Sequence, residues 1–221
     1  MVMFVEISGF LFLLIIVLLV IASVRYGYKT FSELDPEAQL QIIEKSPKKF
    51  RIGTTLVVSE HFVIVILAIT LFIAFSSYNI VLGVIWLVSR GTEGLIQLYN
   101  KRNYWGLLGI ADQYSSQSGP EREALSDSAL SILRSKNSNF SIAQILFSVG
   151  TLAYSILFAF YAVIPVLIGW FGIVSSIIYG SGNVIARIKP DSKVLWNLGG
   201  LSIWIFELVL GGYLLLSSLI P

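Results

Sequence analysis

The sequence contains no cysteine and a single histidine, His61, in 221 residues. Disulfide bonds, thiolate nucleophiles, iron–sulfur clusters and cysteine zinc sites are therefore excluded, and metal or haem sites built from several histidines have no residues to form them. Charged residues are also few, at 13% of the chain. An ordinary soluble domain carries about 25% charged residues, so this composition speaks against a soluble protein.

Apolar residues make up 56% of the chain, and the mean hydropathy is +0.82. They fall into long blocks, each close to the roughly 20 residues that a helix needs to cross the hydrocarbon core of a bilayer. The blocks predict transmembrane helices over 3–24, 53–75, 80–100, 139–160, 166–186 and 194–219. The predicted fold class is thus an all-α integral membrane bundle of six transmembrane helices, forming one domain over residues 1–221.

Every Lys and Arg except Arg90 lies in three of the connections, over 25–52, 101–138 and 187–193. The positive-inside rule assigns these loops to the cytoplasm, so we expect a multi-pass protein of the cell membrane with both termini extracytoplasmic. The first apolar block is longer than the core of a signal peptide, and we expect it to be retained as a helix. Loop charge of this kind sets topology, and no nucleic-acid partner is predicted.

Two of the basic loops are expected to contain short helices. The run Asp35-Pro36-Glu37 is typical of a helix start, and that helix is predicted to run towards Ser46. A second helix is predicted to begin near Pro120, because apolar residues recur after it at helical spacing, at Leu125, Ala129, Ile132 and Leu133. We expect both helices to lie on the inner membrane face, as connectors or as docking elements for lipid or a partner.

Small residues recur every four positions in the fifth predicted span, at Gly172, Ser176 and Gly180. A stripe of small residues lets the backbone of another helix approach closely within a membrane. We therefore expect close helix packing along this face.

Three stretches resemble one known family. They are QIIEKSPKKFRIG at 41–53, AQILF at 143–147 together with IPVLIGWFG at 164–172, and FELVLGGYLL at 206–215. Each is similar to the corresponding part of the domain-of-unknown-function 4386 family of prokaryotic multispan membrane proteins, over about residues 35–217. The resemblance implies a multispan architecture, and it implies no reaction, substrate or cofactor.

Several polar residues lie inside the predicted spans, where a charged side chain is costly and needs a partner or a function. The candidates for ligand binding or a proton relay are Glu60, His61, Arg90, Glu93, Gln144 and Glu207. Arg90 and Glu93 are three residues apart and share one helix face, and Glu60 is expected at a similar depth in the preceding span. Glu207 is expected nearer the outer half, away from Glu93.

Three interpretations of this polar set stay open: a buried ion pair that locks neighbouring helices, a site for an anionic head group, and a proton relay. His61 is expected to be a hydrogen-bonded core residue, and neither a metal site nor a cofactor is predicted. The sequence has no Walker loop, HExxH motif, nucleophile elbow with a partner histidine, or dinucleotide fingerprint. An enzyme using Glu60, His61 and Glu93 remains an open alternative, although no catalytic residue is assigned and the sequence favours a protein that is not an enzyme.

The favoured hypothesis is a non-catalytic membrane module that binds a lipid or small amphipathic ligand in a polar pocket between spans two, three, four and six. Arg90 would hold an anionic head group, while Glu60, Glu93 and Gln144 orient it. A small proton-coupled transporter that uses Glu60, Glu93 or Glu207 is the first alternative. A structural or assembly subunit of a membrane complex is the second. Membrane lipids are the expected partners, and the sequence indicates no particular protein partner.

Overall fold

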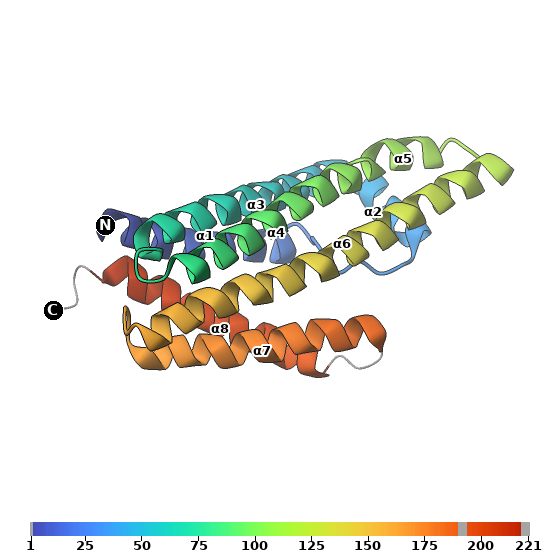
Figure 1. Cartoon of the computed structure of the whole chain (residues 1–221). Helices are drawn as coiled ribbons and strands as arrows, with labels where there is room; N and C mark the ends of the chain where they lie inside the picture. The colour runs from blue at the N-terminus through green and yellow to red at the C-terminus, as the bar shows by residue number, and fades with distance from the viewer. Residues whose placement is uncertain (1, 190–193, 218–221) are drawn as a thin grey trace. The chain divides into compact units, whose positions relative to one another are not determined.

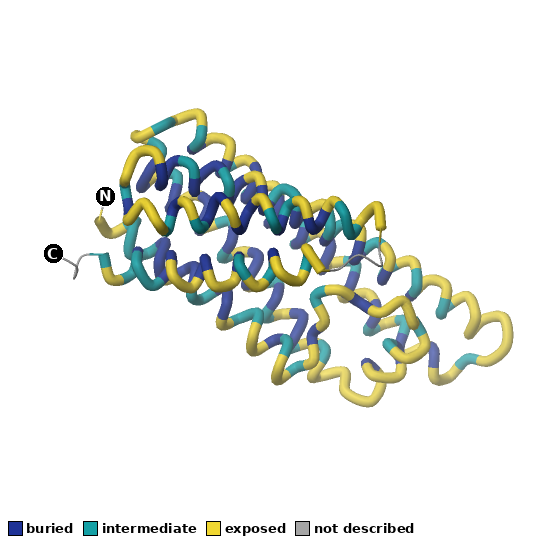
Figure 2. The backbone as a smooth tube through the Cα atoms, turned by 90° about the horizontal axis from the view of Figure 1, so that it is seen from below, coloured by how far each residue is buried: buried dark blue, intermediate teal, exposed yellow. Residues whose placement is uncertain are grey.

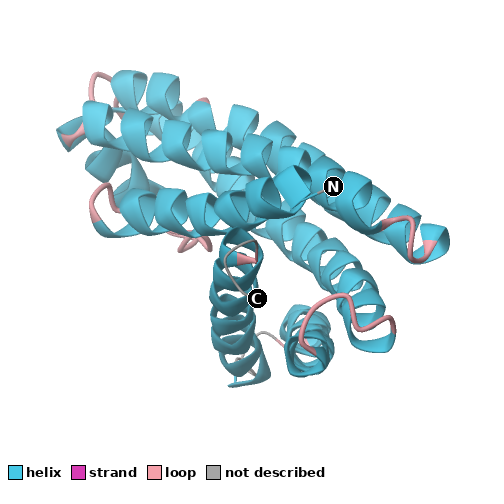
Figure 3. Cartoon of the chain, turned by 90° about the vertical axis from the view of Figure 1, so that its left-hand side faces the viewer, coloured by secondary structure: helices cyan, strands magenta, loops and turns pink. Residues whose placement is uncertain are grey.

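The computed structural model describes residues 2–189 and 194–217 (Figure 1). All regular secondary structure in these residues is helical (Figure 3). The helices are α1 (Val2–Val24), α2 (Pro36–Lys45), α3 (Pro47–Phe75), α4 (Ile80–Trp105), α5 (Leu107–Tyr114), α6 (Gly119–Phe160), α7 (Val166–Ile188) and α8 (Val194–Leu216). Within the described ranges, six helical segments are long and apolar enough to cross a membrane, which confirms the predicted all-α bundle of six spans.

The long helices alternate buried and exposed residues along their length (Figure 2). Their exposed positions carry large apolar side chains, such as Leu167 at 83%, Val81 at 64% and Leu95 at 61% exposure. A soluble protein rarely exposes so much contiguous apolar surface, whereas a membrane-spanning helix presents it to lipid.

The predicted helix after Asp35 is confirmed as α2. The Asp35 carboxylate accepts a hydrogen bond from the Ala38 amide at 3.0 Å, and Pro36 occupies the first helical position, where it needs no donor. The helix expected to begin near Pro120 does begin there, at Gly119, but its separation from the following span is wrong, because residues 119–160 form one continuous helix of 42 residues. No Gly or Pro stands between Pro120 and Gly150, so nothing in the sequence interrupts the helix.

The helix ends differ from the predicted span ends mainly on the side of the basic loops. Helix α3 begins at Pro47 rather than 53, and α4 continues to Trp105 rather than 100. Helix α5 was not predicted. Part of the predicted loop over 187–193, including Lys193, and the predicted end of the last span at 218–219 lie outside the described residues.

The chain divides into two compact units. Unit 1 comprises residues 1–16, 62–95 and 141–221, and unit 2 comprises residues 17–61 and 96–140. Helices α1, α3, α4 and α6 contribute residues to both units.

The core of unit 1 is built around Tyr154, which is fully buried. Its ring lies 5.6–6.3 Å from four other aromatic rings, those of Phe12, Trp86, Phe158 and Phe206. The α3–α4 hairpin is closed by a hydrogen bond of 3.1 Å from the Trp86 indole to the Ala68 carbonyl. Aromatic contacts of this kind add packing energy beyond the area that they bury.

The small-residue stripe of α7 packs against its neighbours within unit 1. A Cβ atom added at Gly172 would lie 2.3 Å from Ser155 Oγ and 2.5 Å from the Phe206 ring, and one added at Gly180 would lie 3.0 Å from Ser148 Cβ. Helix α8 runs beside α7 (Figure 1). The structure therefore shows the close approach that the stripe predicts.

Helix α1 ends within unit 2, and a left-handed turn follows it. Gly27 has a φ of +69°, a conformation that side chains with a Cβ adopt only at a cost. The amides of Gly27 and Tyr28 bond back to the Ser23 and Ala22 carbonyls at 3.0 Å each. The turn buries Tyr28 in a core that also contains the residues Leu40, Ile43, Val57, Tyr104, Leu107, Ala129 and Leu133.

Candidate functional sites

An ionic cluster lies inside unit 1, on helices α4 and α8. The Arg90 guanidinium donates a hydrogen bond of 2.8 Å to Glu93, and it lies 3.9 Å from the Glu207 carboxylate. All three side chains are at least nine-tenths buried. One guanidinium thus stands between two carboxylates from different helices, which neutralises charge that would otherwise be costly in a membrane interior.

The guanidinium of Arg90 also lies 4.3 Å from the centroid of the Phe147 ring on α6. A cation at this distance over an aromatic face gains further stabilisation where water is excluded. Gly150, one turn along α6, provides the space: a Cβ there would lie 2.7 Å from Arg90 Cγ. Three helices of unit 1 therefore converge on this one side chain.

Gln144 belongs to a second polar group of unit 1, between α6 and α7. Its side-chain oxygen accepts a hydrogen bond of 2.7 Å from the Tyr179 hydroxyl. The Asn183 amide donates to the Tyr179 carbonyl at 2.8 Å. Such bonds hold helices together in lipid, which is the structural role open to Gln144.

Glu60 and His61 lie in unit 2, near the middle of α3. Both are buried, at 5% and 6% exposure, and His61 Nδ1 lies 3.0 Å from Glu60 Oε2. The two groups are close without the alignment of a hydrogen bond, and neither ring nitrogen of His61 has a hydrogen-bond partner among the described residues. This polar pair is the least satisfied of the predicted site residues.

Two further lysines are buried in unit 2, Lys101 on α4 and Lys136 on α6, each at 1% exposure. Their ammonium groups donate to uncharged oxygens: Lys101 to the Gln97 amide at 3.3 Å, and Lys136 to Ser32 Oγ at 2.6 Å and to the Lys29 carbonyl. Neither ammonium takes part in the ion pairs found among the described residues. Both side chains are thus held by polar groups that carry no charge.

Tyrosine rings complete the surroundings of these lysines. Lys136 Nζ lies 4.9 Å from the centroid of Tyr28 and 4.5 Å from that of Tyr104, and Lys101 Nζ lies 5.5 Å from that of Tyr28. Burial raises the pKa of the Tyr28 phenol well above its ordinary value, with the charges of Tyr104 and Glu60 acting in the same direction. Tyr28 therefore stays a neutral hydrogen-bond donor at physiological pH.

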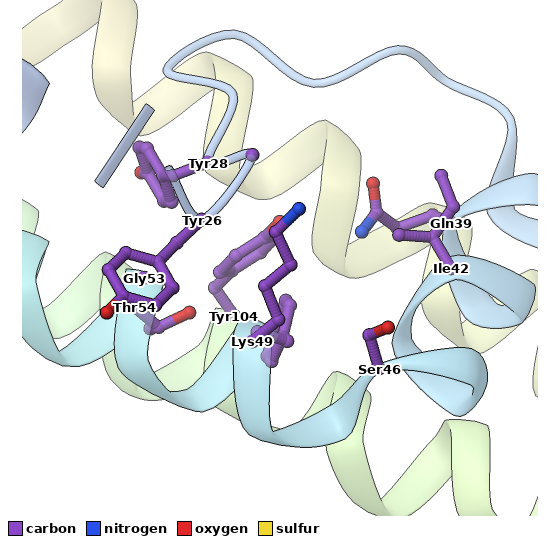
Figure 4. A pocket seen from close by; sticks show the side chains of 11 residues that line it. Tyr26, Tyr28, Gln39, Ile42, Ser46, Lys49, Gly53, Thr54 and Tyr104 are labelled. Carbon is purple, nitrogen blue, oxygen red and sulfur yellow. The ribbon is translucent and has the colours of Figure 1, made fainter. Parts of the chain in front are cut away.

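The same two tyrosines line a pocket of unit 2 (Figure 4). The pocket encloses about 370 Å³ including its open mouth, and its wall consists of Tyr26, Gly27, Tyr28, Gln39, Ile42, Ser46, Lys49, Phe50, Gly53, Thr54 and Tyr104. Figure 4 shows Lys49 extending along Tyr104, with Tyr26 and Tyr28 on one side and Gln39 and Ile42 on the other. We call it the tyrosine pocket.

Two hydroxyl groups in the wall of the tyrosine pocket have no hydrogen-bond partner in the described part of the chain, those of Tyr28 and Thr54. Both residues are more than nine-tenths buried, at 8% and 1% exposure. A buried hydroxyl without a partner costs free energy, so these two groups are the least satisfied polar groups of the wall.

The sequence model of one family, described as Domain of unknown function (DUF4386), matches residues 7–217. The chain belongs to the DUF4386 family. No curated protein and no solved structure matches it. The family confirms the resemblance found in the sequence, and its description leaves the site chemistry to be argued from the side chains themselves.

In this DUF4386 chain, four of the six predicted site residues lie in unit 1 and two in unit 2. The pairing of Arg90 with Glu93 is confirmed at 2.8 Å. Glu207, which was expected to lie apart from Glu93, approaches the same guanidinium. Gln144 bonds to Tyr179, and Glu60 and His61 are neighbours in their own unit.

The tyrosine pocket and the two buried lysines near Tyr28 were not predicted from the sequence. Lys101 and Lys136 stand at the ends of apolar blocks, where a basic residue is ordinarily a solvated marker of topology. Tyr26, Tyr28 and Tyr104 stand at the same ends, where tyrosine is typical of the membrane interface. Their shared position was a signal, but only the fold shows that the rings and ammonium groups meet.

Proposed function

We propose that this protein is a non-catalytic membrane module that binds a small amphipathic ligand, and that the tyrosine pocket is its binding site. The observation that carries the proposal is the wall of the pocket, in which the unpartnered buried hydroxyls of Tyr28 and Thr54 stand beside aromatic rings. The pocket is small and open at its mouth, so it would take a head group rather than a whole lipid.

The lining of the pocket is itself amphipathic. Lys49, Ser46 and Gln39 offer polar groups, and Ile42 and Phe50 offer apolar surface. Ile42 is 59% exposed, so a ligand could cover it with a hydrocarbon segment while its polar end enters the pocket. This division of polar and apolar surface favours a ligand with one polar and one apolar end.

The contacts of Arg90 favour a different role from the head-group binding that the sequence suggested. Its guanidinium already faces Glu93 and Glu207, and an anion would have to replace one of these carboxylates. The contacts favour the interpretation that Arg90 holds α4 and α8 together. We therefore assign ligand binding to the tyrosine pocket.

The test is a steric block of the pocket mouth. Ile42→Trp adds bulk to an exposed residue that lines the pocket, and Ile66→Trp makes the same change at an exposed residue of unit 1. Native mass spectrometry of each variant, released from native-membrane nanodiscs, reports which adduct stays bound. We expect one defined adduct in the parent and in Ile66→Trp, and its loss in Ile42→Trp.

Two outcomes would contradict the proposal. Only heterogeneous bulk lipid bound to the parent would mean that the pocket selects no ligand. An adduct retained equally by both tryptophan variants would place the binding site elsewhere. Circular dichroism of both variants confirms that they are folded before the comparison is made.

A second candidate function is proton-coupled transport, favoured by the placement of the Arg90 guanidinium between two carboxylates at 2.8 Å and 3.9 Å. Protonation of one carboxylate would let the guanidinium pair with the other, which is the kind of exchange that a proton-driven transporter uses. Proteoliposomes with an imposed pH gradient test it across a substrate panel. A flat response, with Glu207→Gln no different from the parent, would remove this candidate.

The cell membrane and outward-facing termini are also part of the proposal. The distribution of Lys and Arg supports both, because it assigns the connections that line the tyrosine pocket to the cytoplasm. The pocket would then open towards the inner leaflet and the cytosol.

A further inference from the structure

The tyrosine pocket collects hydrogen-bond donors and positive charge. Lys49, Gln39, Ser46, Thr54 and Tyr28 all belong to its lining, and each has a side-chain hydrogen-bond donor. Acidic side chains are absent from that lining. A group that accepts several hydrogen bonds and carries negative charge would therefore match the wall better than a neutral one.

Lys49 differs from the adjacent Lys48 in its position relative to the tyrosine pocket. Lys48 and Lys49 are adjacent and exposed in the first turn of α3, but only Lys49 lines the pocket. Figure 4 shows its side chain reaching along Tyr104 into the middle of the lining residues. An ammonium group in this place can bind a ligand oxygen that the neighbouring side chains also contact.

From these observations we infer that the tyrosine pocket is a phosphate site, which takes the phosphate group of an anionic lipid or of a small soluble phosphate ester. The inference rests on the proposed function and names its ligand class. A phosphate monoester presents several terminal oxygens, which can accept hydrogen bonds from the Lys49 ammonium and from neighbouring polar side chains of the lining. Ile42 and Phe50 supply apolar surface in the same lining, which the remainder of a lipid could cover.

The experiment compares phosphatidic acid with diacylglycerol, which differ only in the phosphate group. The parent protein, in uncharged detergent at low ionic strength, is titrated with each lipid, and native mass spectrometry measures the fraction bound. Lys49→Gln should weaken phosphatidic acid binding about tenfold or more, since a charge-assisted hydrogen bond is lost. Lys48→Gln should change it by less than about twofold, as expected for a charge outside the site.

A soluble arm identifies the source of the phosphate. Glycerol 3-phosphate is titrated alone by calorimetry and as a competitor of phosphatidic acid. Binding of phosphatidic acid that glycerol 3-phosphate does not displace supports a lipid head group. Binding of glycerol 3-phosphate that depends on Lys49, without preference for the lipid, supports a soluble ester.

Two results would overturn the inference, and they are distinguishable. Equal binding of diacylglycerol and phosphatidic acid, unaffected by Lys49→Gln, would overturn the phosphate site and leave a pocket for neutral amphipaths. Failure of the parent to bind either lipid or glycerol 3-phosphate, together with no adduct from native membranes, would overturn both this inference and the proposed function.

Discussion

Replacing Arg90 with methionine is expected to destabilise unit 1 severely. The Arg90 guanidinium lies 2.8 Å from Glu93 and 3.9 Å from Glu207. At an effective dielectric constant of about 20, each attraction is on the order of 4–6 kcal/mol before desolvation is subtracted. Desolvation cancels most of this gain while the three charges are together, but Arg90→Met leaves two carboxylates buried without it. We therefore expect a loss of about 3–5 kcal/mol in the free energy of unfolding.

The assay is equilibrium unfolding in mixed micelles with increasing dodecyl sulfate, followed by tryptophan fluorescence. Arg102→Met, at an exposed position of the same helix, is the control and should change the free energy by less than about 0.5 kcal/mol. The triple variant Arg90→Met, Glu93→Gln, Glu207→Gln removes the stranded charges and should recover at least half of the loss. The reasoning is refuted if Arg90→Met costs under about 1 kcal/mol, or if the triple variant is no more stable than the single one.

Three further predictions follow from backbone geometry, packing and loop charge. Gly27→Ala should lower the free energy of unfolding by about 1 kcal/mol, because φ is +69° at this position. Gly109→Ala, in helix α5 with open space around it, is the control and should leave the free energy of unfolding unchanged or raise it in the same assay. Gly172→Ala should lower the free energy of unfolding by about 1–3 kcal/mol, since its Cβ would lie 2.3 Å from Ser155 Oγ. Gly91→Ala is the control, because nothing lies within 4 Å of a Cβ there. An equal or smaller loss for Gly172→Ala than for Gly91→Ala would contradict the close packing at Gly172. The chain has no cysteine, so single cysteines report sidedness directly: an impermeant maleimide on intact cells should label Ser77→Cys and not Ser116→Cys, and the reverse pattern would invert the topology.

The six spans could be predicted from the sequence because each depends on a local property, the length of an apolar block. The N-terminal cap of α2 was predictable for the same reason, since Asp35 and Ala38 are three residues apart. The extent of α6 was not, because the polar run over 134–139 separates the helix predicted near Pro120 from the predicted span over 139–160. Polarity alone does not end a helix when neither Gly nor Pro interrupts it.

The contacts of the candidate sites were likewise predictable only where they depend on local spacing. The Arg90–Glu93 pair follows from their spacing on one helix, and the structure confirms it. The approach of Glu207 does not follow from spacing, because it depends on how α8 packs beside α4 within unit 1. The tyrosine pocket depends on contacts between a turn after α1, the start of α3 and the end of α4, which no local pattern encodes.

The two units hold their buried basic side chains in different ways, and this difference supports placing the proposed ligand site in unit 2. In unit 1 the guanidinium of Arg90 faces two carboxylates of the protein itself, so an anionic ligand would have to displace one of them. In unit 2 the side chains of Lys101 and Lys136 contact an amide, a hydroxyl, a carbonyl and aromatic faces, none of which is an anion. The exposed Lys49 lines the tyrosine pocket with no acidic side chain in the same lining, so an anion proposed to bind there would displace no carboxylate of the wall.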